Sequence, residues 1–111
     1  MLVADLKDAC LKLIECKDLA LARTPFEMAG EIENLFRGRE GRKSIIELHQ
    51  QRVAWVRNNL QSVLDWIGIS DRRRWKIEPL IVVDQELFTP YLQTSSIQIL
   101  SIEQLMRNVD R

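Results

Sequence analysis

The hydrophobic pattern of the first residues predicts a β-hairpin. Two short runs rich in Leu, Ile and Val, residues 1–4 and 11–17, are separated by Lys7-Asp8, a pair suited to a tight turn. A turn centred there places Ala4 opposite Leu11 and Asp5 opposite Cys10.

Capping patterns predict the helices that follow. Residues 24–27, Thr-Pro-Phe-Glu, have the form of a capping box and open a helix to about Phe36. Its apolar positions predict one buried stripe: Ala29, Ile32, Leu35 and Phe36. A second box at residues 44–47 opens a long helix that should stop at Gly68. Its apolar residues recur every three or four positions: Val53, Val56, Leu60, Val63 and Ile67.

The second half of the chain predicts the centre of the sheet. Residues 80–83, Leu-Ile-Val-Val, form a continuous apolar run, which is typical of a strand covered on both faces. Pro79 fits only at the start of such a strand or on an unpaired side. A weaker strand at 97–100 and a capping pattern at 101–104 precede a last helix, from Ile102 to about Val109. The order ββααββα indicates an α/β fold, a small mixed sheet flanked by helices.

Composition fits one globular domain over residues 1–111. The chain is 46% hydrophobic and 29% charged, with a formal net charge of zero. No apolar run approaches the roughly 20 residues that span a bilayer, so we expect a cytoplasmic protein without a membrane partner. The two cysteines should be reduced thiols, and Cys16 should be a small buried hydrophobe. Zero net charge argues against strong nucleic-acid binding unless cationic residues cluster locally.

The residues with the clearest chemistry lie at the end of the second predicted strand. Side chains alternate along a strand, so Glu15 and Lys17 share one face, whereas Ile14 and Cys16 point into the core. There, a carboxylate can hold a divalent cation and an ammonium can face a phosphate. This pairing suits phosphodiester hydrolysis.

The run Ile-Glu-Cys-Lys-Asp-Leu at 14–19, with Arg-Thr-Pro at 23–25, extends this pattern. Glu-x-Lys on the second strand of a hairpin, followed by a helix, resembles the second half of the signature of the PD-(D/E)xK nuclease superfamily, which has the restriction-endonuclease-like fold. The resemblance implies a metal-dependent DNA endonuclease. It makes Glu15 a ligand of Mg²⁺ or Mn²⁺ and the backbone carbonyl of Cys16 a second ligand. Lys17 would position the attacking water or stabilise the developing charge.

The chain departs from that family at its beginning. The family carries its signature Asp on the preceding strand, where the predicted register puts the partner of Glu15 before Met1. Asp5 lies roughly 16 Å away along the strand. The family's first helix has no counterpart either, so we interpret the chain as a fragment or as a natural remnant without half of its metal site. A single Glu15 should bind Mg²⁺ poorly, and we expect little or no cleavage.

Two basic clusters are candidate DNA contacts. They comprise Arg37, Arg39, Arg42 and Lys43 before the long helix, and Arg72, Arg73 and Arg74 after it. The length of the helix predicts that they lie too far apart for one patch. Because no aromatic residue interleaves either cluster, ordinary solvated loops are the alternative interpretation.

Other interpretations need no catalysis. Glu15 and Lys17 also fit a solvated ion pair, and His49 fits a packed, hydrogen-bonded residue. Trp55 and Trp66 lie off the main apolar stripe, so they should pack against other elements or a partner. The first strand would be a sheet edge prone to pairing with a second copy. The alternative function is therefore a non-catalytic interaction domain that dimerises on a nuclease scaffold, and a plain structural domain is a third option.

Overall fold

The computed structural model describes residues 1–19, 22–85, 87, 90 and 96–109, apart from the side chains of 108 and 109. Its strands are β1 (Leu2–Asp5), β2 (Cys10–Lys17), β3 (Lys76–Val83) and β4 (Gln98–Ser101). Its helices are α1 (Pro25–Ile32), the π-helical turn η1 (Glu33–Arg37), α2 (Ile45–Asn58), α3 (Leu60–Trp66) and α5 (Ile102–Val109). None of these helices is both long and apolar enough to cross a membrane.

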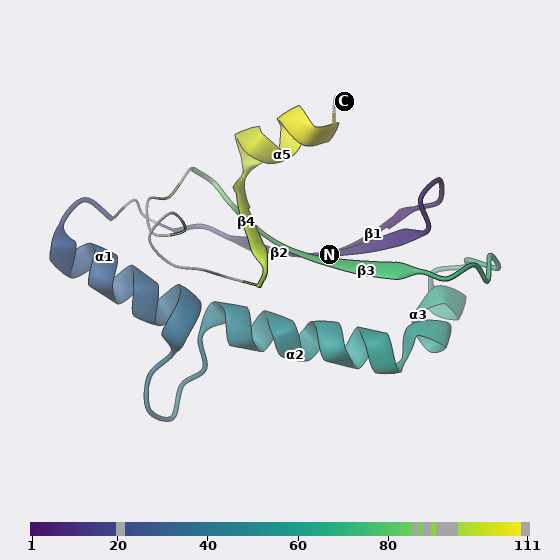
Figure 1. Cartoon of the computed structure of the whole chain (residues 1–111), viewed down its shortest axis with the longest axis horizontal. Helices are drawn as coiled ribbons and strands as arrows, with labels where there is room; N and C mark the ends of the chain where they lie inside the picture. The colour runs from purple at the N-terminus through teal and green to yellow at the C-terminus, as the bar shows by residue number, and fades with distance from the viewer. Residues whose placement is uncertain (20–21, 86, 88–89, 91–95, 110–111) are drawn as a thin grey trace.

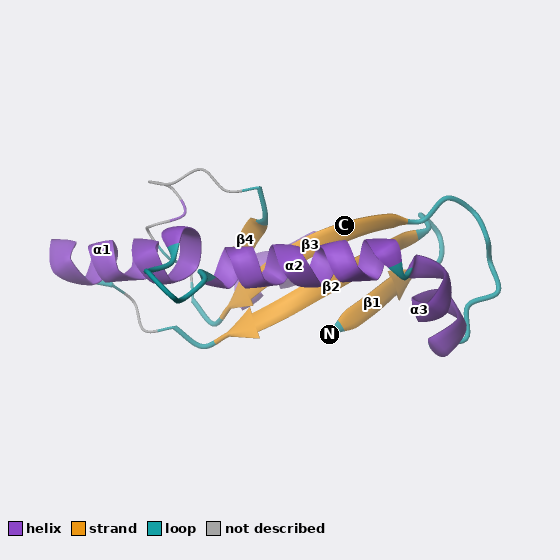
Figure 2. Ribbon diagram, turned by 90° about the horizontal axis from the view of Figure 1, so that it is seen from below, coloured by secondary structure: helices purple, strands orange, loops and turns teal. Residues whose placement is uncertain are grey.

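The four strands form one mixed sheet in the order β1-β2-β3-β4. The β1–β2 pair is antiparallel, while β2–β3 and β3–β4 are parallel. Helix α2 covers one face of the sheet and α5 lies over the other (Figures 1 and 2). The prediction of an α/β domain with a mixed sheet between helices is therefore confirmed.

The hairpin has the predicted register. Leu2 pairs with Leu13, Ala4 with Leu11 and Asp5 with Cys10. Asp5 also stabilises the turn, because its Oδ1 accepts the backbone N–H groups of Lys7 and Asp8 at 3.0 and 3.3 Å.

Strand β3 is central, as its continuous apolar run predicts. Every residue from Leu80 to Val83 is at most 4% exposed. Ile81 and Val83 pack with Ile46 of α2, whereas Leu80 and Val82 pack with Ile14 on the face of α5. Strand β4 pairs only from Leu80 onward, so among the described residues Pro79 has no partner on that side of β3.

All three predicted N-caps form, and the residues at 101–104 form the complete reciprocal box. Thr24 Oγ1 and Ser44 Oγ each accept the backbone N–H three residues later, at 3.1 Å. Ser101 and Gln104 exchange two hydrogen bonds, from the Gln104 N–H to Ser101 Oγ and from the Ser101 N–H to Gln104 Oε1.

Two helix predictions need correction. The long helix is divided at Asn59, whose φ of −122° and ψ of 26° are not helical, so α2 and α3 are separate. The first helix carries no buried residue within α1; Ala29 is exposed, and Leu35 in η1 is the buried position. Figure 1 shows that α1 lies beyond the end of the sheet, so none of the described strands runs beneath it.

Candidate functional site

Glu15 and Lys17 lie together at the carboxyl end of β2. They follow Leu11 and Leu13 at every second position of β2. Because these leucines pack under α2, Glu15 and Lys17 point to the same face of the sheet. Lys17 Nζ is 3.3 Å from Glu15 Oε1. The strand therefore places this pair on one face, as predicted.

A third charged group, Arg52 of α2, completes this cluster and was missed by the sequence analysis. Its Nη1 is 2.9 Å from Glu15 Oε2. Ile46 near the start of α2 packs on Val83, so the helix begins over the carboxyl ends of the strands. Helical side chains lean toward the helix N-terminus, which directs Arg52 back toward Glu15. The available signal was its spacing of three residues from His49, which places both on one flank of the helix.

His49 fixes α2 against β2. Its side chain is 1% exposed, and its Nε2 lies 3.0 Å from the Leu13 carbonyl oxygen. Within the described residues its Nδ1 is buried without a hydrogen-bond partner. The hydrogen bond to a carbonyl requires a proton on Nε2, so His49 is a packed, hydrogen-bonded residue as predicted.

The cluster of Glu15, Lys17 and Arg52 does not supply the ligands that the implied Mg²⁺ or Mn²⁺ would need. Each oxygen of Glu15 already faces a cation, and the described residues contain no group of three or more acidic, His or Cys side chains that could hold a metal ion. Asp84 follows β3 at the same sheet end, but its Oδ1 accepts the Leu19 N–H at 3.4 Å. Asp5 lies at the hairpin turn, in the predicted register far from Glu15. A hard cation needs oxygen ligands that this arrangement does not supply.

The expectation that Cys16 is buried is wrong. Cys16 shares the α5 face of the sheet with Ile14, but Leu105 of α5 packs against the cluster around Ile14 and leaves the end of β2 exposed. Cys10 is half-buried, with its Sγ 3.7 Å from Glu78 Oε2. Burial, followed by the charge of Glu78, raises the pKa of the Cys10 thiol above its ordinary value of 9.0.

These environments predict different thiol reactivities. At about pH 8 Cys16 should react with a disulfide reagent roughly ten or more times faster than Cys10, because the thiolate is the nucleophile and Cys10 is both covered and harder to ionise. The release of thionitrobenzoate from Cys10→Ser and Cys16→Ser gives the two rates separately. Equal rates, or a faster Cys10, would contradict the structure.

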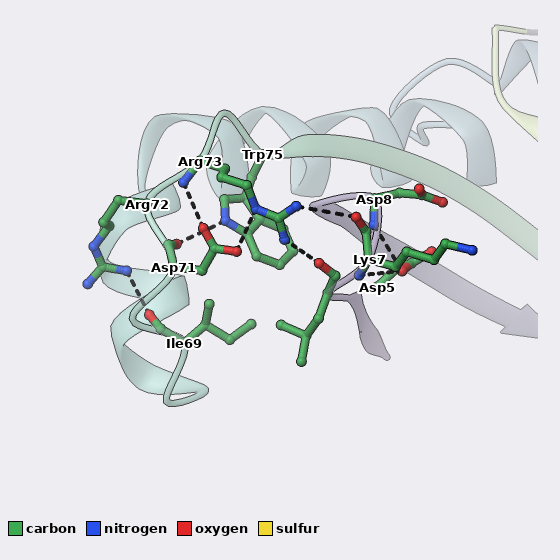
Figure 3. Close-up of polar contacts among 9 residues, drawn as sticks. Asp5, Lys7, Asp8, Ile69, Asp71, Arg72, Arg73 and Trp75 are labelled. Carbon is green, nitrogen blue, oxygen red and sulfur yellow. Dashed lines mark hydrogen bonds and ion pairs between the residues drawn. The ribbon is translucent and has the colours of Figure 1, made fainter.

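The basic cluster after α3 is used within the fold. Arg73 donates to the carbonyl oxygens of Leu6 and Lys7 in the hairpin turn, the latter at 3.3 Å, and its Nε bonds Asp71 Oδ2 at 2.6 Å (Figure 3). Arg72 bonds the Ile69 carbonyl oxygen at 2.7 Å and pairs with Asp65. Arg74 is exposed. Two of the three predicted DNA contacts in this cluster therefore have structural partners.

The basic cluster before α2 lies at the opposite end of that helix, as expected (Figure 1). Arg39 and Arg42 pair through their backbones, and Arg39 Nε bonds Glu33 Oε2 at 2.8 Å. Arg39, Arg42 and Lys43 line a hollow of about 190 Å³ together with Glu33, Asn34 and Gly38. Arg37, the fourth predicted contact, is exposed on η1.

Asp71 links its loop to Arg73 and Trp75. Its backbone carbonyl accepts the Trp75 indole N–H at 3.0 Å, and its side chain accepts the Arg73 N–H at 2.9 Å. Hydrogen bonds from the backbone and side chain of Arg73 lower the pKa of Asp71 below its ordinary value of 3.8. A carboxylate with a lowered pKa stabilises the fold above that value, and the contribution is lost as the pH falls through the folded pKa.

This linkage predicts an acid-dependent effect of Asp71→Asn. The variant should melt at a lower temperature than the parent at about pH 6. The difference should shrink as the pH falls below about 4, because the unfolded parent then binds a proton at Asp71 before the folded parent does. Melting temperatures across this pH range, with Asp8→Asn on the exposed turn as control, make the comparison. A difference that stays constant down to about pH 2.5 would exclude the linkage.

Comparison with known proteins adds no relative. No family model, no curated protein and no solved structure matches the chain.

Proposed function

We propose that this domain is built on the PD-(D/E)xK nuclease scaffold and binds the phosphate backbone of DNA without cleaving it on its own. The proposal rests on one observation: Glu15 and Lys17 lie side by side at the carboxyl end of a hairpin strand, with Arg52 on the other carboxylate oxygen. In open α/β sheets, ligands bind outside the carboxyl ends of parallel strands, and β2 and β3 both end there.

The chemistry favours an anion at this position rather than a metal ion. Lys17 and Arg52 are 38% and 51% exposed, so each can exchange its bond to Glu15 for a bond to a phosphodiester oxygen. Partly exposed ion pairs stabilise a fold by at most about 1 kcal/mol, which makes this exchange inexpensive. Glu15 then acts as an internal competitor of the phosphate.

The basic loop before α2 extends this surface. It lies on the α2 side of the sheet, toward the end where β2 stops (Figures 1 and 2). Its hollow with Arg39, Arg42 and Lys43 has room for a phosphate group, and its glycine Gly38 has a φ of 75° that brings the chain around this hollow. A second phosphate of the same backbone is the proposed occupant.

Removing the competing carboxylate should strengthen DNA binding. At low salt, Glu15→Gln should bind a labelled duplex roughly 3- to 10-fold more tightly than the parent chain, because Lys17 and Arg52 lose their internal partner. Fluorescence anisotropy measures both dissociation constants.

Glu103→Gln is the matched control, since it removes the same charge from an exposed position on α5, on the opposite face of the sheet. An equal gain in DNA affinity in both variants would show that the change in net charge alone causes the effect. No binding by the parent or by Glu15→Gln at low salt would refute the proposed site.

Because the residues around Glu15 supply too few oxygen ligands for a metal ion, we expect little or no nicking of supercoiled DNA with Mg²⁺ or Mn²⁺. Agarose gels read the nicked fraction after incubation with the full chain. Robust metal-dependent nicking that Glu15→Ala abolishes and Glu103→Ala preserves would overturn the proposal of a binding domain, and would establish Glu15 as a metal ligand.

A further inference from the structure

Strand β1 presents an unpaired edge. Met1 and Ile14 exchange two backbone hydrogen bonds, at 2.8 and 3.0 Å, and hydrogen-bonded pairs alternate along an antiparallel ladder. The backbone groups of Leu2 and Ala4 therefore point away from β2. Among the described residues no strand lies outside β1, so these groups form a template for another strand.

An apolar hollow of about 460 Å³ runs along the same edge. Leu2 of β1 lines it together with Trp55, Val56, Ser62, Val63 and Trp66 from α2 and α3. Trp55 is 60% and Trp66 82% exposed, so of the two predicted alternatives, packing against other elements is wrong and packing against a partner stays a prediction. Asn59 ends α2 and lets α3 begin, and the hollow is shared by both helices. Two exposed indoles around one hollow mark an interaction surface.

We propose that this surface binds a second copy of the chain. A two-fold axis perpendicular to the sheet pairs β1 with its counterpart antiparallel and extends four strands to eight. The same axis keeps both α2–α3 layers on one side of the sheet, so the tryptophans of the two copies face each other across it. A patch that serves both partners in this way is self-complementary.

The exposed area and the charge of this surface support a second copy of the chain as the binding partner. The exposed parts of the two indoles amount to roughly 200–350 Å². A stable interface needs at least about 500 Å² per partner, and the edge of β1 with Met1, Leu2 and Val3 supplies further area. Met1 and Val3 are 68% and 40% exposed. The chain has no net charge to oppose association, and Asp5 is the single charged side chain of β1, so antiparallel pairing about Val3 sets the two carboxylates at opposite ends.

Sedimentation velocity over a concentration series tests the dimer with the full chain. We expect a species of twice 13.0 kDa. Ala4→Pro removes an outward N–H while leaving the bonds to β2, and Trp66→Ala removes the more exposed indole; each should weaken the dimer at least roughly tenfold. Phe26→Ala is the control, because Phe26 is 88% exposed but lies on α1, away from this edge.

Three results would overturn the proposal: a monomer at every concentration, a dimer that withstands both Ala4→Pro and Trp66→Ala, or a dimer that Phe26→Ala weakens equally. Circular dichroism checks that each variant is folded. If Ala4→Pro disturbs the hairpin, Trp66→Ala decides alone, since it changes an exposed side chain outside the sheet. The DNA affinity of Glu15→Gln is measured separately, so failure of the dimer leaves the proposed phosphate site to its own test.

Discussion

The register of β2 between β1 and β3 is the constraint on which the rest of the domain depends. It is paired on both sides, antiparallel to one neighbour and parallel to the other. Because its side chains alternate, Leu11 and Leu13 bury under α2 and carry Glu15 to the same face. A shift of one residue would expose both leucines and move Glu15 away from Arg52. Packing of the apolar residues and placement of the charges are therefore set by one register.

The elements around Glu15 place a cation beside each of its carboxylate oxygens. His49 bonds the Leu13 carbonyl oxygen and holds α2 close to β2, which brings Arg52 within 2.9 Å of the carboxylate. Lys17 reaches the other oxygen from the same strand. A carboxylate between two cations is a poor ligand for Mg²⁺, whereas its two partners are suited to an oxyanion. The proposed phosphate site thus depends on the two cations that flank Glu15.

The two ends of the sheet have different physical characters. The end where β2 stops carries Glu15, Lys17 and the basic loop before α2. The other end holds Arg73, which bonds the hairpin turn, and the hollow bordered by Trp55 and Trp66. Figure 1 places the loop before α2 and helix α3 at opposite ends of α2. Between these ends the two proposed surfaces approach each other, because Arg52 and Trp55 lie one helical turn apart on α2 and Leu2 pairs with Leu13, close to Glu15.

Local signals in the sequence determined the secondary structure and the face of the key pair. The capping boxes, the hairpin register and the buried run of β3 depend on neighbouring residues, and alternation alone put Glu15 beside Lys17. Only the tertiary structure decided what each side chain meets. Arg52 lies 37 residues from Glu15, and Arg73 bonds the Lys7 carbonyl oxygen from 66 residues away. Cys16, Trp55 and Trp66 are exposed because no described element covers these positions. The pattern of a strand or helix indicates which of its faces is apolar. Whether that face is buried depends on the length and position of the element that covers it, and long-range packing determines both.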